Sequence, residues 1–197
     1  MPSPLNRLLV LGSSSPYRRE LLARLRIPFD VAVPGVDETP LPGENPRQIA
    51  CRLAMSKARA VAARFSDAVV IGSDQVADLN GEALGKPLVH DVAVAQLRRM
   101  SGQRVLFQTA VAVVCDASRF AQLELAQVAV RFRSLGDAEI EAYLQAEQPY
   151  DCAGSAKSEG LGITLLDAID SDDPTALVGL PLIRTCRMLR AAGIALL

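Results

Sequence analysis

Apolar residues follow two periods along this chain, one typical of strands and one typical of helices. Continuous apolar runs and alternating runs rich in valine predict strands over residues 8–11, 29–34, 68–72, 104–115, 124–133 and 163–169. Helical spacing predicts helices that begin at Pro16 and Pro46, span residues 91–100 and 137–147, and begin again near residues 179–181. Because strands and helices intermix from end to end, the predicted fold class is α/β, or mixed α+β.

The segment Gly12–Glu20 joins the first predicted strand to the first predicted helix and has the features of an anion site. Ser15 suits the N-cap and Pro16 suits the first helical position. Such a turn directs free backbone N–H groups and the positive end of the helix dipole at one point, where a phosphate would be stabilised. Arg18 and Arg19 stand in the first turn, where helix electrostatics favours acids, so a bound phosphate would explain them. The alternative is that both are solvated surface cations.

A polar triplet follows the second buried run. Residues 68–72 are apolar and lead into Ser73-Asp74-Gln75, which the pattern places at the end of a strand. Ligands of open α/β sheets gather at the carboxyl ends of strands, so we expect Asp74 and the Ser13 turn to face one cleft. Asn80-Gly81, a few residues further on, predicts a β-hairpin.

Three further charged residues occupy predicted loops and a helix. Lys86 lies in the constrained loop Gly85-Lys86-Pro87, and Glu38 lies in a proline-rich loop. Lys57 belongs to the helix that Asn45 caps. Most helical lysines keep their ammonium group in water, so the pattern alone makes Lys57 a solvated residue.

Composition and charge narrow the function. The chain has 197 residues, 50% of them apolar but only 4% aromatic, which predicts a large aliphatic core in one generous domain or two small lobes. The net charge of −1 argues against nucleic-acid binding. The four cysteines form no CxxC pair, so we expect reduced, mostly buried thiols. Without an apolar leader or a run of ~18 apolar residues, the expected protein is cytoplasmic and does not contact the membrane.

Several catalytic classes lack their signals. The single histidine, His90, stands beside Asp91 at a helix start and is interpreted as structural, which leaves no second base for a Ser-His-Asp triad. Neither a GxGxxG fingerprint nor a GxxxxGK[ST] loop occurs. The remaining dispersed polar residues suit phosphoryl chemistry around a hard divalent ion, because that chemistry needs positioning and charge neutralisation. They are Ser13, Arg18, Glu38, Lys57, Asp74 and Lys86.

Six short motifs in a fixed order make the chain resemble the Maf family of nucleoside triphosphate pyrophosphatases along essentially its whole length. They are Leu11-Gly12-Ser13-Ser14-Ser15-Pro16 with Arg18-Arg19, Val36-Asp37-Glu38, Lys57-Ala58, Gly72-Ser73-Asp74-Gln75, Gly85-Lys86-Pro87 and Val178-Gly179-Leu180-Pro181. Within the family the chain is similar to the branch that hydrolyses 7-methyl-GTP. Tyr17, Gln75 and Glu159 carry that similarity, whereas the dTTP/UTP branch typically has Arg, Thr and Gln there. The methyl-GTP branch often has Trp at the position of Tyr17, so an aromatic residue is kept.

The resemblance implies a hydrolase that cleaves the α–β phosphoanhydride bond of 7-methyl-GTP, giving 7-methyl-GMP and diphosphate and so removing a modified nucleotide. It implies a divalent cation, Mg²⁺ or Mn²⁺, and a small-molecule nucleoside triphosphate as the partner. It also implies one domain over residues 1–197 with an elongated mixed sheet flanked by helices, as in inosine-triphosphate pyrophosphatases. The cleft then lies between two lobes, and the resemblance allows a homodimer.

The resemblance also implies a role for each site residue. Glu38 and Asp74 hold the metal, and Asp74 is the proton acceptor that orients the attacking water, with a low pKa beside the ion. Arg18, Lys57 and Lys86 hold the triphosphate, and the Ser13 turn adds hydrogen-bond donors.

Tyr17, Gln75 and Glu159 would read the base. The methylated guanine ring carries a positive charge, which a Tyr17 ring face attracts by cation–π interaction. The Glu159 carboxylate complements that charge and accepts the guanine N–H groups. On residue type alone, Tyr17 would instead pack at a helix start and Glu159 would be a solvated loop acid.

Two other functions stay open from the sequence. The first is the dTTP/UTP specificity of the same family, which Glu159 argues against. The second is a nucleotide-binding regulator of septum formation with little catalysis, the role for which the family was first named. A binding module has no need of paired carboxylates beside three cations, and release of diphosphate would separate the two.

Overall fold

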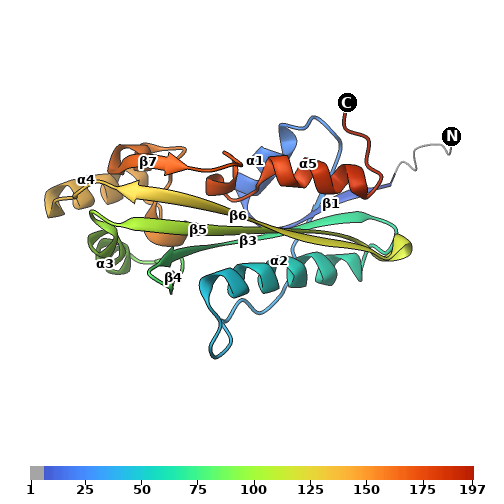
Figure 1. Ribbon diagram of the computed structural model, residues 1–197, viewed down its shortest axis with the longest axis horizontal. Coiled ribbons are helices and arrows are strands. Elements are labelled where there is room, and N and C mark those ends of the chain that lie inside the picture. Colours follow the sequence, from blue (N-terminus) through green and yellow to red (C-terminus); the bar gives the residue numbers. More distant parts are fainter. Residues whose placement is uncertain (1–6) are drawn as a thin grey trace.

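A seven-stranded mixed sheet runs the length of the protein, with strand order β2-β1-β3-β5-β6-β7 and β4 paired to β3. The structure, a computed structural model, describes residues 7–197. The strands are β1 (Leu9–Gly12), β2 (Asp30–Ala32), β3 (Val69–Leu79), β4 (Glu82–Leu84), β5 (Arg104–Cys115), β6 (Phe120–Phe132) and β7 (Leu166–Asp170). Strands β1, β2 and β3 are parallel to one another, and the other pairs are antiparallel. The α/β class and the elongated mixed sheet are confirmed (Figure 1).

Five α-helices flank the sheet in the described residues 7–197. They are α1 (Pro16–Ala23), α2 (Pro46–Ala62), α3 (His90–Met100), α4 (Asp137–Glu147) and α5 (Leu182–Ala191). Figure 1 shows α2 along one face, α1 and α5 over the other face at one end, and α3 and α4 at the opposite end. The predicted caps are confirmed: the Ser15 hydroxyl accepts from the Arg18 N–H, and Asn45 forms a capping box with Gln48.

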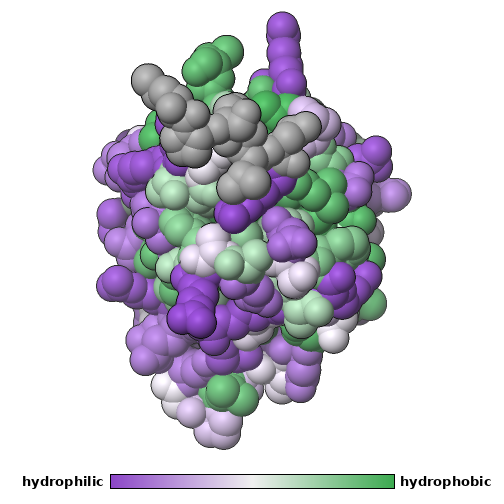
Figure 2. All heavy atoms as spheres, turned by 90° about the vertical axis from the view of Figure 1, so that its right-hand side faces the viewer, coloured by the Kyte–Doolittle hydropathy of each residue, from purple (hydrophilic) through white to green (hydrophobic). Residues whose placement is uncertain are grey.

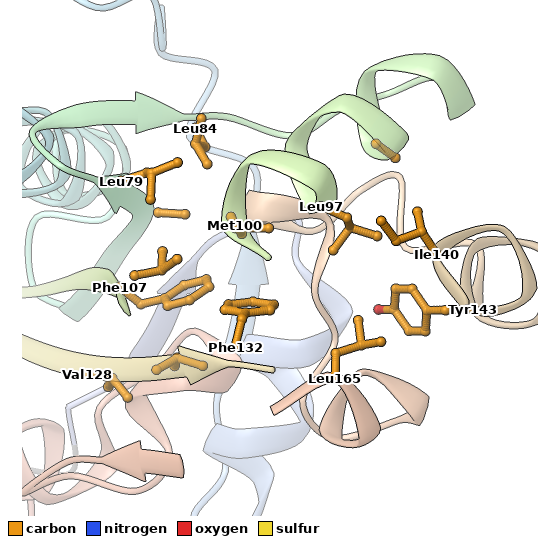
Figure 3. Packing of buried hydrophobic residues seen from close by; sticks show 14 of the residues in the cluster. Leu79, Leu84, Leu97, Met100, Phe107, Val128, Phe132, Ile140, Tyr143 and Leu165 are labelled. Carbon is orange, nitrogen blue, oxygen red and sulfur yellow. The ribbon is translucent and has the colours of Figure 1, made fainter. Parts of the chain in front are cut away.

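Three aliphatic clusters fill the spaces between these layers. One lies under α2, one under α1 and α5, and one joins α3 and α4 to the sheet. Figure 3 shows this third cluster, in which Leu97 and Met100 of α3 point towards Phe107, Phe132 and the helix α4 residues. Such burial fixes the positions of the helices that carry the polar residues described below.

The polar triplet lies inside a strand, not at its end. Strand β3 continues through Ser73-Asp74-Gln75 to Leu79, so the predicted strand end at Gly72 is wrong. The reason is pairing: β5 accompanies β3 from Val70 to Asp78, which keeps the polar stretch extended. On the other edge of β3, β1 ends opposite Gly72, and β4 pairs only from Ala77 onwards. The edge of β3 between Gly72 and Ala77 therefore faces a gap in the sheet.

Three smaller expectations can also be compared with the structure. The hairpin at Asn80-Gly81 joins β3 to β4, as predicted. Strand β7 begins at Leu166 because residues 161–165 form a 3₁₀ turn, so the prediction of a strand from residue 163 is wrong by three residues. All four cysteines are free thiols, but only Cys115 is fully buried.

Figure 2, a view onto one end of the molecule, shows hydrophilic and hydrophobic side chains interspersed on the surface. Among the described residues, no helix has both the length and the apolar character needed to span a membrane.

Candidate active site

A cleft opens at the gap in the sheet beside β3 and gathers residues from segments far apart in the chain. Eight of the nine residues predicted for the site line it: Ser13, Tyr17, Arg18, Glu38, Lys57, Gln75, Lys86 and Glu159. The ninth, Asp74, is 6% exposed and lies behind Lys57. The exposed Arg19 is not among the lining residues. Of the two arginines in the first turn of α1, the structure therefore places only Arg18 in the cleft.

Lys57 is the centre of the buried part of this cleft. Its ammonium nitrogen lies 2.7 Å from Glu38 Oε1 and 2.7 Å from Asp74 Oδ1, and the residue is only 4% exposed. The pattern-based interpretation of Lys57 as a solvated lysine is wrong. An ammonium group is buried only when it is paired, and here two carboxylates provide that pairing.

Gly72 explains how Lys57 reaches Asp74. A Cβ atom built at Gly72 would lie 2.3 Å from Ala54 O and 2.5 Å from Ala58 N, so the backbones of α2 and β3 are in direct contact there. No side chain larger than hydrogen fits between them. The close approach brings Lys57, on α2, over Asp74, two residues beyond Gly72 in β3.

The two carboxylates differ in acidity. Burial raises the pKa of Asp74 above its ordinary value, although the charges of Lys57 and Arg18 oppose the shift. Partial burial would also raise the pKa of Glu38, but the hydrogen bond and charge of Lys57 outweigh burial and lower it. The expected low pKa of Asp74 assumed a neighbouring metal ion. Without one, this carboxylate holds a proton more readily than an ordinary aspartate does.

Arg18 is oriented by the loop that precedes α5. Its Nε donates to the carbonyl of Gly179 at 2.8 Å, and Nη1 lies 3.5 Å from Ser13 Oγ. The same carbonyl accepts from Ser73 Oγ at 3.1 Å. Burial lowers the pKa of the Arg18 guanidinium, while Asp74 and Glu38 raise it, and an arginine stays charged at neutral pH in any case. Arg18 is thus a fixed cation at the edge of the cleft.

The other end of the cleft is built from Tyr17 and the segment 151–159. The Tyr17 hydroxyl donates to Asp151 Oδ1 at 3.4 Å, and Lys157 Nζ lies 5.7 Å from the centre of the Tyr17 ring. Burial raises the pKa of Glu159 and, with help from Cys152, that of Tyr17. Burial and Asp151 raise the pKa of Cys152 to about 12. This thiol therefore stays protonated and is a poor nucleophile at neutral pH.

The two ends of the cleft have opposite charge. At one end, Arg18, Lys57 and Lys86 outnumber Glu38 and Asp74. At the other, Asp151 and Glu159 line the cleft, and the ammonium of Lys157 is already paired with Glu147 at 2.8 Å. We name them the triphosphate end and the base end, after the parts of a nucleotide that the family resemblance implies for them. An anionic group fits the first and a cationic or hydrogen-bonding group fits the second.

The motifs, the fold and this cleft agree with one protein family. A model of the family described as Maf-like protein matches residues 8–192. The chain belongs to the Maf-like family. Individual relatives match this chain over nearly its full length.

Three of these relatives, each named 7-methyl-GTP pyrophosphatase, illustrate the similarity. The Maf-like chain is 72% identical to the protein of Albidiferax ferrireducens over 197 residues, which cover 100% of this chain and 99% of the relative. It is 73% identical to a protein of a Polaromonas species over 194 residues, covering 98% and 89%. It is 56% identical to the protein of Cupriavidus metallidurans over 193 residues, covering 98% and 97%.

The two carboxylates of this Maf-like protein fit a hard divalent ion whose other ligands are phosphate oxygens and water. Glu38 and Asp74 lie close to each other, since the Lys57 ammonium contacts one oxygen of each at 2.7 Å, and each carboxylate has a second oxygen. In the part of the chain that the structure describes, three or more His, Cys, Asp or Glu side chains do not gather into a metal site. Mg²⁺ is commonly held by one or two carboxylates with phosphate oxygens and water completing the shell. The two carboxylates match that pattern.

Gln75 is more constrained than the sequence indicates. Its amide nitrogen donates to Thr109 Oγ1 at 3.0 Å and to the carbonyls of Ala176 and Leu177 at 2.9 Å each. The amide N–H groups are thus engaged within the protein. Gln75 holds the loop that forms one wall of the cleft, and only its carbonyl oxygen is left for a ligand.

Sequence reasoning missed Asp151 and Cys152, which also line the cleft. Neither lies in a recognisable motif. The only signal is their place between Pro149, which follows a predicted helix, and Gly154. His90, interpreted as structural, bonds to Tyr150 and Glu141 and is not among the lining residues.

Proposed function

We propose that this Maf-like protein hydrolyses 7-methyl-GTP at its α–β phosphoanhydride bond, releasing 7-methyl-GMP and diphosphate. The main observation in support of this substrate is that the two ends of the cleft have opposite charge. The substrate has the matching distribution: an anionic triphosphate at one end and a cationic methylated ring at the other. The names of the relatives support the same substrate.

At the triphosphate end, the cations bind and orient the phosphates. Lys86 is exposed at the rim, and Arg18 is fixed by the Gly179 carbonyl. Lys57 uses two of its three N–H donors on Glu38 and Asp74, which leaves the third for a phosphate oxygen. These fixed charges offset the charge that builds up on the departing diphosphate.

Glu38 and Asp74 would hold a Mg²⁺ or Mn²⁺ ion, which when bound would neutralise phosphate charge and acidify a coordinated water. Asp74 accepts the proton of the attacking water. Lys57 bonds to Asp74 Oδ1, which leaves Oδ2 as the oxygen free to meet the ion or the attacking water. The water oxygen bonds to the α-phosphorus, the bond to the bridging oxygen breaks, and diphosphate leaves with that electron pair.

At the base end, charge and aromatic contact select the methylated ring. The Tyr17 ring offers a cation–π contact, and its hydroxyl is oriented by Asp151 at 3.4 Å. Glu159 adds a carboxylate that attracts the ring charge and accepts N–H groups. Neutral guanine would gain the hydrogen bonds but not the charge attraction. Selection of the methylated base therefore depends on the charge of Glu159.

The proposed setting is the pool of free nucleotides in the cytoplasm, from which modified nucleotides are removed. Neither a nucleic acid nor a membrane is needed for this activity. A homodimer stays a prediction of the family resemblance.

The test compares diphosphate release from 7-methyl-GTP, GTP, dTTP, UTP and CTP, with Mg²⁺ or Mn²⁺ and with both ions chelated. Strong metal-dependent preference for 7-methyl-GTP is the expected result. Preference for dTTP or UTP would keep the reaction but contradict the roles of Tyr17, Gln75 and Glu159. Tight nucleotide binding without release would favour the regulatory alternative.

A further inference from the structure

Gln96, a buried residue of α3 outside the cleft, joins the two walls that carry Lys86 and Glu159. It is 8% exposed, and its amide Nε2 donates to the carbonyl of Gly85 at 3.1 Å. Its Oε1 accepts from Ser155 Oγ at 2.6 Å. A carbonyl oxygen can only accept, so the Gly85 contact fixes which end of the amide is the nitrogen.

Each partner of Gln96 adjoins a part of the cleft. Gly85 immediately precedes Lys86, which lines the triphosphate end. Ser155 lies between Cys152 and Glu159 in the segment that forms the base end. One amide group therefore bridges the backbone before a phosphate-binding lysine and the segment that carries the base-reading acid.

The Ser155 side of the bridge holds an unfavourable backbone. Ser155 has φ of 55° and the preceding Gly154 has φ of 68°, so two consecutive residues lie in the left-handed region. A non-glycine residue there is strained, and such strain persists only where the surroundings enforce it. The Ser155 hydroxyl is completely buried. Without Gln96 it would lose the acceptor that compensates its burial.

The Gln96 side is rigid, because its neighbours on α3 are anchored. Leu97 and Met100 are fully buried in the cluster shown in Figure 3. Two backbone contacts run parallel to the bridge: Gly154 N–H to the Gly85 carbonyl at 3.4 Å and Leu88 N–H to the Tyr150 carbonyl at 3.0 Å. These contacts keep the walls together, while the two side-chain contacts of Gln96 join both walls to the rigid helix α3.

We propose that Gln96 is a positioning residue that fixes the distance between the triphosphate end and the base end of the cleft. A ligand that touches only one end can adjust to a small shift of either wall. A nucleoside triphosphate must meet both ends at once, and a misplacement of about 1 Å can reduce activity by about 100-fold. The inference rests on the proposed function only in taking the ligand to span both ends.

The test uses Gln96→Met, which keeps the length and volume of the side chain and removes both hydrogen bonds. Dissociation constants are measured for 7-methyl-GTP, for tripolyphosphate as the triphosphate-end probe, and for 7-methylguanosine as the base-end probe. We expect 7-methyl-GTP to bind about 10-fold more weakly, and each half-ligand to change by less than about twofold. Turnover of 7-methyl-GTP should fall as well.

Three further variants separate positioning from general destabilisation. Gln108→Met changes another buried glutamine whose amide bonds to Asp78 and Gln127 away from the cleft, and it should leave all three constants unchanged. Ser155→Ala removes one of the two contacts and should show a smaller loss of the same kind. If Gln96→Met does not fold, Ser155→Ala provides the test in its place. The double variant Gln96→Met/Ser155→Ala should be no worse than Gln96→Met alone.

Two outcomes would overturn the proposal. If tripolyphosphate and 7-methyl-GTP weaken by the same factor, Gln96 acts on the Lys86 loop alone. If Gln96→Met cannot be distinguished from Gln108→Met in binding, its role is only structural. Binding needs no turnover, so absence of diphosphate release by the unaltered protein would contradict the proposed function and leave this test in force. If the unaltered protein prefers another nucleoside triphosphate, the same measurements use that nucleotide and its nucleoside in place of 7-methyl-GTP and 7-methylguanosine.

Discussion

The two ends of the cleft are built on different kinds of support. At the triphosphate end, Lys57 lies on helix α2 and Asp74 lies inside strand β3, and both are almost completely buried. At the base end, Asp151 and Glu159 are exposed residues of an irregular segment. That segment is tied to α4 through Glu147, whose carboxylate accepts from the Leu161 N–H at 2.7 Å and pairs with Lys157.

Because of this difference, the residues proposed for catalysis and those proposed for substrate selectivity lie on different parts of the fold. Groups that must be placed within fractions of an ångström are fixed by sheet and helix backbones. Groups that choose the base stand in a surface segment, where substitutions disturb little of the core. Changes at the triphosphate end should therefore affect turnover or folding strongly, whereas changes at the base end should alter selectivity and leave folding intact.

The largest effect is expected from Asp74→Asn, which removes the proton acceptor but keeps its size. Turnover of 7-methyl-GTP should fall by about 1,000-fold, within the range typical for loss of a general base. Steady-state kinetics with circular dichroism as the folding check would measure it. Asp78→Asn is the matched control, because Asp78 belongs to the same strand but bonds to Gln108 and the Gly81 N–H rather than to Lys57. Near-parental turnover in Asp74→Asn would refute the assignment.

Gly72→Ala should be the most damaging change to stability. The added methyl group would meet Ala54 O at 2.3 Å and Ala58 N at 2.5 Å, both backbone atoms that cannot move without shifting α2. The free energy of unfolding should fall by about 3 kcal/mol, at the upper end of overpacking costs. Denaturant titration measures it, with Gly136→Ala as the control because a Cβ there meets nothing within 4 Å. A loss as small as that of Gly136→Ala would contradict the close helix–strand contact.

Glu159→Gln should change selectivity by a smaller factor. The ratio of kcat/KM for 7-methyl-GTP to that for GTP should fall about 10-fold, since a charge near the surface contributes about 1–2 kcal/mol to a close ionic contact. Glu82→Gln, whose acid pairs with Arg99 and does not line the cleft, should leave the ratio unchanged. An unaltered ratio in Glu159→Gln would show that the base end does not read charge through this residue.

The smallest effect is a pH dependence of the same ratio. Burial raises the pKa of Glu159 in the free protein, so its charge is lost as the pH falls through a value above the ordinary 4.5 of a glutamate. Selectivity for 7-methyl-GTP should therefore be full at neutral pH. It should decline on acidification while an ordinary glutamate is still ionised. In Glu159→Gln the ratio should not follow this titration, and an identical decline in both proteins would assign it to another group.

Local patterns predicted the helices and most strands, because caps, turn residues and apolar periods are local properties. The N-caps Ser15 and Asn45 are examples. The motifs of the family resemblance, by contrast, supplied several members of the site. Long-range contacts decided what the patterns missed. Strand β3 extends past Gly72 because a distant strand pairs with it, and Lys57 is buried because Gly72 admits α2.

The same limit applies at the base end. Asp151 reaches Tyr17 across 134 residues of sequence, and the Gln75 amide is engaged by carbonyls about a hundred residues away. Residue types alone do not reveal such partners. Motifs identified which side chains meet at the cleft, while their pairing and burial required the folded chain.

The Gly179 carbonyl has a consequence for biosynthesis. It is the acceptor that orients both Arg18, 161 residues earlier, and Ser73. During translation both donors emerge long before their shared acceptor, so the nascent chain displays its phosphate-binding turn well before that turn is locked in place. A polypeptide that stops short of residue 179 would contain every residue predicted for the site and still leave Arg18 without its anchor.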